Sequence, residues 1–146
     1  MLKIAHPVAG AAALVTIATF WLSTAGAELF GSEATVAAVK TTIPWGFLLL
    51  IPALAITGGS GFALAKGRRP NLIRAKLKRM PIVAGNGILV LIPAALFLAA
   101  KARAAEFDAG FFVVQAVELI AGLANILLLG LNMRDGLRIK GRLRSP

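Results

Sequence analysis

Four long apolar stretches separated by short polar segments make up most of the chain. They run from about His6 to Leu29, Ile43 to Ala65, Pro81 to Ala100 and Ala109 to Met133. Because an α-helix rises about 1.5 Å per residue, roughly 20 apolar residues cross the hydrocarbon core of a bilayer. The runs are continuous rather than alternating, which favours helices over a β-barrel. The pattern therefore predicts transmembrane helices over 6–29, 43–65, 81–100 and 109–133.

The first stretch has a second interpretation as a secretory signal peptide. Lys3 precedes its apolar core, and Ala25-Gly26-Ala27 resembles a small-residue cleavage site. The apolar run is longer than the core of an ordinary signal peptide. We therefore expect a retained first helix.

Composition supports a membrane protein without a soluble domain. Hydrophobic residues make up 58% of the chain, the mean hydropathy is +0.83, and cysteine is absent. The absence of cysteine excludes disulfides, thiolate metal sites and cysteine nucleophiles. The segments between the helices are too short to fold alone, and short connections favour antiparallel neighbours. We expect a single all-α domain over 1–146, an integral membrane four-helix antiparallel bundle.

The charges are distributed unevenly around these helices. The chain has 16 Lys and Arg against 6 Asp and Glu, a net charge of +10. Three of the basic residues, Lys40, Lys101 and Arg103, fall on one side of a four-span topology. The other thirteen fall on the opposite side, most of them in a loop at 66–80 and a tail at 134–146: Lys3, Lys66, Arg68, Arg69, Arg74, Lys76, Lys78, Arg79, Arg134, Arg138, Lys140, Arg142 and Arg144. The positive-inside rule then predicts that both termini are cytoplasmic.

The basic segments lie directly beside membrane spans, which decides between two kinds of partner. A basic arm for nucleic acid would extend into solvent, whereas charges at this position meet lipid head groups. We expect anionic lipids as partners and no nucleic acid. A membrane-protein partner or a second copy of the chain is compatible with the same pattern.

The fourth predicted helix carries a polar stripe. The positions recur at spacings of three and four and therefore share one face, which we expect to point inward: Gln115, Glu118, Gly122, Asn125, Leu129 and Asn132. Asn86, between two glycines of the third helix, is a further interior polar candidate.

Glu118 is the one formal charge expected deep inside a span. An ionisable residue at that depth is either functional or a polar contact that holds helices together. Since no Lys or Arg is expected at its depth, we predict a protonated carboxyl at neutral pH.

His6 is the only histidine, and it begins the first predicted helix. A neutral imidazole can ligate haem iron or a metal, but a lone histidine at a membrane surface is also an ordinary interfacial residue. Met80 and Met133 are expected at the same level, and a thioether serves as second axial ligand in some cytochromes. Lys76 can approach the same level. Methionine at a helix end is otherwise simple packing.

Several strings resemble a known group of proteins. They are Lys3-Ile4-Ala5-His6, Phe20-Trp21-Leu22-Ser23, Thr57-Gly58-Gly59-Ser60-Gly61 and Ala75-Lys76-Leu77-Lys78. In these strings and in its hydropathy profile, the chain is similar to four-helix membrane modules related to the copper-resistance D-type domain and the bacterial four-helix protoporphyrinogen oxidase. The resemblance implies a bacterial inner-membrane location and b-type haem bound through His6.

No catalytic motif identifies an activity. The expected function is binding of b-type haem or a porphyrin in a cytoplasmic-side cleft, for electron transfer or porphyrin handling. One alternative is a non-catalytic subunit or scaffold of a larger membrane complex. Another is a small transporter that uses Glu118 as a proton or cation site. The string Gly130-Leu131-Asn132-Met133-Arg134-Asp135-Gly136 matches no motif.

Overall fold

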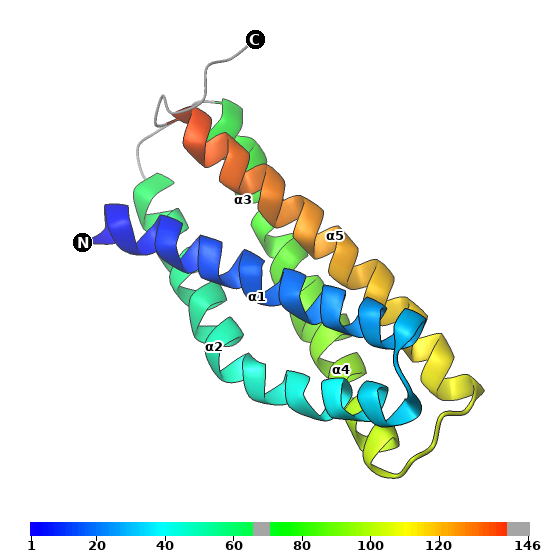
Figure 1. The fold of residues 1–146 in the computed structure, drawn as a ribbon. Coiled ribbons are helices and arrows are strands. Elements are labelled where there is room, and N and C mark those ends of the chain that lie inside the picture. Colours follow the sequence, from blue (N-terminus) through cyan, green and yellow to red (C-terminus); the bar gives the residue numbers. More distant parts are fainter. Residues whose placement is uncertain (66–70, 140–146) are drawn as a thin grey trace.

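The computed structural model describes residues 1–65 and 71–139, and every element in that part of the chain is helical. The long helices are α1 (Leu2–Phe30), α2 (Glu33–Ala65) and α5 (Ala109–Ile139). A further helix consists of α3 (Asn71–Asn86), the π-helical segment η1 (Gly87–Leu91) and α4 (Ile92–Arg103). In Figure 1 the α1–α2 and α4–α5 connections lie at one end of the molecule, and the start of α1 and the end of α5 lie toward the other.

Four stretches among the described residues are long and apolar enough to cross a membrane: Ile4–Phe30, Glu33–Ala65, Arg74–Arg103 and Ala109–Arg138. Their outward faces are apolar, and Leu48 and Leu89 expose 74% and 77% of their surface. Lipid solvates such side chains without the cost that water would impose. The chain therefore has the architecture of a multi-pass membrane protein.

The helices pack in a ring: α1 contacts α2 and α5, and the α3–η1–α4 helix contacts the same two helices from the other side. Ala13, Ile17 and Ala53 belong to one buried cluster together with Val83. A second cluster, which includes Ala27, Leu98 and Phe111, lies nearer the two connections. Alanines at these contacts let the helix backbones approach closely.

The helix α2 begins ten residues before the predicted position 43. The connection from α1 is only Gly31 and Ser32, and the Ser32 Oγ accepts a hydrogen bond from the Thr35 N–H at 3.3 Å. A Cβ at position 31 would lie 2.6 Å from the Ala27 carbonyl oxygen, so the turn requires glycine. This N-cap extends the helix through the expected outer loop, and Lys40 becomes an interior helical residue.

The basic segment before the third span is also more helical than expected. Of the predicted loop at 66–80, residues 71–80 are helical, and residues 66–70 lie outside the described part. Likewise α5 continues from the predicted end at 133 to Ile139, and the tail beyond it lies outside the described residues. Lysine and arginine residues can continue a helix at this level, because their long, flexible side chains carry the charges to the head groups.

Pro93 explains the π-helical segment in the third span. The backbone N–H of Ile92 bonds the Gly87 carbonyl, five residues earlier. Pro93 has no N–H for the Leu89 carbonyl, so the ladder is interrupted directly after the wider turn. Pro44 and Pro52 lie within α2 without ending it.

The α4–α5 connection is held by backbone and charge contacts. Ala105 has a φ of 55°, and the Glu106 N–H bonds the Lys101 carbonyl at 3.0 Å, which closes α4 in a left-handed cap. Asp108 caps α5: its Oδ1 accepts from the Phe111 N–H at 2.9 Å, while its Oδ2 lies 2.6 Å from Lys101 Nζ. The Lys101 ammonium, followed by the Phe111 N–H, lowers the pKa of Asp108 below its usual 3.8.

Candidate ligand-binding site

A cavity of about 260 Å³ lies at the end of the bundle where α1 begins and α5 ends, and we call it the His6 cavity. Residues from α1, α2, α3 and α5 line it: His6, Pro7, Gly10, Ala11, Thr57, Lys76, Met80, Leu129, Asn132, Met133, Gly136 and Leu137. Its volume is close to the lower end of the ~300–1,000 Å³ range of organic-ligand sites. All four of the residues singled out as possible ligands, His6, Lys76, Met80 and Met133, line this one space.

Hydrogen bonds fix the His6 ring on both sides. Its Nδ1 lies 2.9 Å from Ser60 Oγ, and its Nε2 lies 2.8 Å from Lys76 Nζ. An ammonium group only donates, so Nε2 accepts and the ring proton resides on Nδ1. Nδ1 then donates to Ser60, whose hydroxyl donates to the Ile56 carbonyl. A Cβ at Gly61 would lie 3.3 Å from His6 Cε1, so the absence of a side chain at position 61 leaves space for the His6 ring.

Asn132 gives the cavity a polar wall with an unused acceptor. The side-chain nitrogen of Asn132 donates to the Met80 sulfur at 3.3 Å. Its Oδ1 is buried, with the residue only 4% exposed, and has no hydrogen-bond partner among residues 1–65 and 71–139. A buried, unpaired amide oxygen is costly unless another molecule donates to it. Position 132 therefore offers an acceptor to an occupant of the cavity.

The unassigned string around Asn132 builds this side of the site. Asn132, Met133 and Gly136 line the cavity, and Asp135 lies just behind it. Asp135 Oδ2 accepts from Arg79 Nη1 at 2.7 Å, and its Oδ1 lies 3.5 Å from Arg134 Nη2. The Arg79 contact ties α5 to α3, and the two arginines neutralise the carboxylate. The sequence alone did not reveal this role, because Arg79 and Asp135 are 56 positions apart.

A second polar cluster lies nearer the opposite end and corrects one prediction. Lys40 Nζ pairs with Glu118 Oε2 and donates to Thr24 Oγ1 at 3.3 Å. Lys40 is only 1% exposed. The premise that no Lys or Arg lies at the depth of Glu118 is therefore wrong, and the prediction of a neutral carboxyl loses its basis. The Gly31-Ser32 turn followed by Glu33 was the available signal that α2 starts early and carries Lys40 inward.

Of the other predicted interior polar residues, Asn86 and Asn125 lie between these two clusters, and Gln115 precedes Glu118 on α5. Asn86 Nδ2 donates to the Ala121 carbonyl at 2.8 Å and to Asn125 Oδ1 at 2.9 Å. Asn125 in turn donates to the Val83 carbonyl at 3.3 Å. Gln115 is buried, and within the described part of the chain its Oε1 has no hydrogen-bond partner. The bonded amides hold α3 against α5, as interhelical hydrogen bonds do in membranes.

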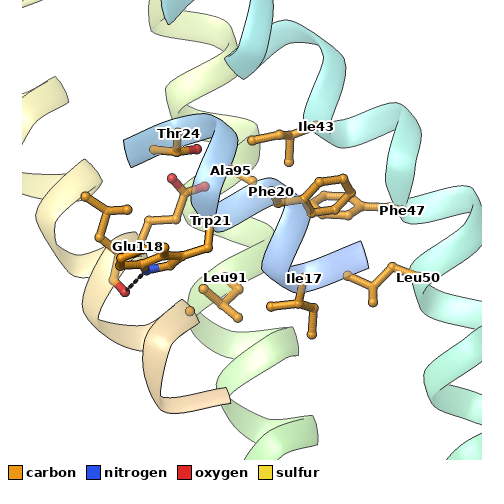
Figure 2. Close-up of a pocket in the computed structure, with 12 residues that line it drawn as sticks. Ile17, Phe20, Trp21, Thr24, Ile43, Phe47, Leu50, Leu91, Ala95 and Glu118 are labelled. Atoms are coloured by element: carbon orange, nitrogen blue, oxygen red, sulfur yellow. Dashed lines mark hydrogen bonds between the residues drawn. The ribbon is translucent and has the colours of Figure 1, made fainter. Parts of the chain in front are cut away.

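Figure 2 shows a smaller cavity of about 50 Å³ beside Glu118. The Trp21 indole Nε1 donates to the Leu119 carbonyl of α5 at 2.8 Å. A Cβ at Gly122 would lie 3.1 Å from Trp21 Cδ1, so this glycine admits the ring. Apart from Glu118 and Thr24, which Lys40 already engages, the remaining walls are apolar and include Ile17, Phe20 and Leu91. We assign this cavity to packing around Trp21 rather than to a ligand.

The residues of the His6 cavity can be tested against a haem iron. A ligating histidine typically donates its other ring N–H to a fixed acceptor, and the His6–Ser60 bond has this form. The ligating nitrogen would be Nε2, which now accepts from Lys76. Met80 and Met133 supply thioethers in the same space. These donor atoms are of the kinds that haem iron accepts, but in this structure Nε2 is engaged by Lys76.

Comparison with known proteins gave no match to a protein-family model, a curated protein or a solved structure. The chemistry of the site is therefore argued from its own residues.

Proposed function

We propose that this protein is an inner-membrane bundle of four antiparallel helices, with both termini cytoplasmic, that binds an amphipathic organic ligand in the His6 cavity. One observation carries the proposal. The polar motifs of four separate segments, including the otherwise unexplained string at 130–136, converge on a single cavity with an unpaired buried acceptor. Helix packing alone requires no such cavity, since close packing is the norm in protein interiors.

The wall chemistry supports an amphipathic ligand. Lys76 and His6 form a polar end, whereas Pro7, Leu129 and Leu137 are apolar. None of the described lining residues is Asp or Glu, and the Lys76 ammonium supplies a cationic donor to the polar end. A ligand with an acidic head and an apolar body matches both ends.

Filling the cavity tests this function. Gly136 lines the cavity, and a Cβ there would lie 3.9 Å from Lys76 Nζ. We expect Gly136→Leu to lose the molecules that mass spectrometry finds in organic extracts of the wild-type protein purified in mild detergent. Gly130→Leu is the matched control, because nothing lies within 4 Å of its Cβ position. Identical extracts from wild type and Gly136→Leu would contradict the proposal.

A second candidate is b-type haem or a related porphyrin, favoured by the convergence of His6 with two methionines. The iron would supply one-electron chemistry, and His6 would hold it. An absorbance spectrum of protein expressed with ample haem should then show a Soret band that His6→Ala removes. Thr19→Ala, on an exposed part of the same helix, should retain it. A colourless wild-type protein, or an unchanged spectrum in His6→Ala, removes this candidate.

A further inference from the structure

The polar end of the His6 cavity presents two unlike groups to an occupant. Lys76 offers a cationic donor that already holds His6 Nε2 at 2.8 Å. Asn132 Oδ1 offers an acceptor that is buried and unpaired. An occupant that uses both groups needs an anionic oxygen and, on the same head group, a hydroxyl or amide hydrogen to donate.

The position of the cavity restricts what can supply such a head group. The lining includes residues from the first turns of α1 and the last turns of α5, so the cavity lies near the ends of the helices rather than at mid-span. Other basic side chains gather at this end, among them Arg74, Lys78 and Arg138. Basic pockets between helices at this level are typical binding sites for anionic lipid head groups.

The neighbouring carboxylate, that of Asp135, has partners of its own. Asp135 is almost fully buried, and both of its oxygens are engaged by arginines, at 2.7 Å from Arg79 and 3.5 Å from Arg134. Within the string at 130–136, the carboxylate of Asp135 is thus already paired. The same string places Asn132 in the cavity wall and leaves space at Gly136. The cavity wall thus presents a cationic donor at Lys76 and an acceptor at Asn132.

We infer that the His6 cavity is a head-group site for an anionic phospholipid that carries free hydroxyls, of the phosphatidylglycerol class. The phosphate binds Lys76, which His6 and Ser60 hold in place. A glycerol hydroxyl donates to Asn132 Oδ1, and the acyl chains follow the apolar wall toward the bilayer. This inference rests on the proposed ligand-binding function and names its ligand class.

Binding of short-chain lipids to the protein in neutral detergent tests the inference. The probes are dihexanoyl phosphatidylglycerol, phosphatidic acid and phosphatidylcholine, with inorganic phosphate as competitor, and native mass spectrometry reports affinity. We expect phosphatidylglycerol to bind most tightly. Lys76→Met should weaken it about tenfold, because a buried charged hydrogen bond is lost. Lys78→Met, an exposed lysine on the same helix, should change it less than about twofold.

Asn132→Leu separates the two contacts. It should lower the affinity for phosphatidylglycerol to that for phosphatidic acid, which has a phosphate but no head-group glycerol. If this variant does not fold, the ratio of the two affinities in the wild type decides the hydroxyl contact, and equal affinities overturn it. Equal losses in Lys76→Met and Lys78→Met would show general surface attraction and overturn the site. Competition by inorganic phosphate at lipid-like concentrations would identify free phosphate instead.

The controls distinguish failure of this inference from failure of the proposed function. If Gly136→Leu removes a bound molecule but Lys76→Met leaves phosphatidylglycerol affinity unchanged, the cavity binds a ligand of another class. If no bound molecule distinguishes Gly136→Leu from the wild type, the binding function itself is wrong.

Discussion

At the residue scale, the Lys40–Glu118 pair shows what a single buried charge requires. Glu118 is mostly buried in α5, and Lys40 reaches it from α2 with almost no exposed surface. Removing one partner of such a pair leaves the other charged and poorly solvated, which costs more than the pair contributes. Glu118 therefore links α5 to α2 through its ion pair with Lys40.

A double-mutant cycle measures this tie. We expect Lys40→Met to lower the free energy of unfolding by about 3 kcal/mol or more, and Lys40→Met combined with Glu118→Leu to recover part of the loss. Lys101→Met, which loses exposed pairs with Glu106 and Asp108, should lower the free energy of unfolding far less. Reversible unfolding in mixed micelles gives these values. Additive effects at Lys40 and Glu118 would show that the two side chains do not interact.

Glycine positions give a second test at this scale. A Cβ on Gly46 would lie 2.2 Å from Phe20 Cζ, whereas nothing lies within 4 Å of the same position on Gly26. Phe20 also packs edge-on against Phe47, with centroids 6.3 Å apart, and this contact restricts the space into which the Phe20 ring can move. We expect Gly46→Ala to be less stable than Gly26→Ala by about 1–3 kcal/mol in the same unfolding assay. Equal stabilities would show that the ring moves freely.

At the element scale, the end of α4 carries a residue in an unfavourable conformation. Ala105 has a φ of 55°, a region in which glycine is normally found at this helix position. Ala105→Gly should raise the unfolding free energy by about 1 kcal/mol, because the strain of Cβ disappears. Ala104→Gly, in the ordinary helical region, should lower it instead. A loss of stability in Ala105→Gly would contradict the capping assignment.

The start of α5 should respond to acid. The pKa of Asp108 is lower in the folded protein than its usual 3.8, so its charged form is the one that stabilises the fold. This contribution is complete above the usual pKa and is lost as pH falls through the lower, folded value. The protection of the Phe111 amide against hydrogen exchange, relative to an unstructured chain at the same pH, should fall over that acid range. Asp108→Ala should show low protection at every pH, and pH-independent protection in the wild type would contradict the cap.

At the scale of the whole molecule, the helix order places the two connections at one end and the basic helix ends at the other (Figure 1). The thirteen-to-three distribution of basic residues predicts that this second end is cytoplasmic. Reporter fusions after Pro146 and within the α1–α2 turn at Ser32 should give opposite signals, with the C-terminal fusion cytoplasmic. A periplasmic C-terminus would reverse the topology and move the His6 cavity to the outer leaflet.

Sequence alone determined the number and approximate centres of the spans, because about 20 apolar residues per crossing is a local requirement that hydropathy records directly. The spacing of Gln115, Asn125 and Asn132 likewise indicated one interior face, since helical periodicity is local. The sequence predicted the ends of the helices less well. Caps such as Ser32 and flexible basic side chains extend helices beyond their apolar cores.

Only the tertiary structure decided which side chains meet. His6 contacts Ser60 and Lys76, 54 and 70 positions away, and Lys40 contacts Glu118, 78 positions away. Such pairs depend on the rotation and depth of each helix relative to its neighbours, which the packing of small residues sets and no local pattern records. The sequence could therefore supply His6, Lys76, Met80 and Met133 as separate candidates, while the fold alone placed them around one cavity.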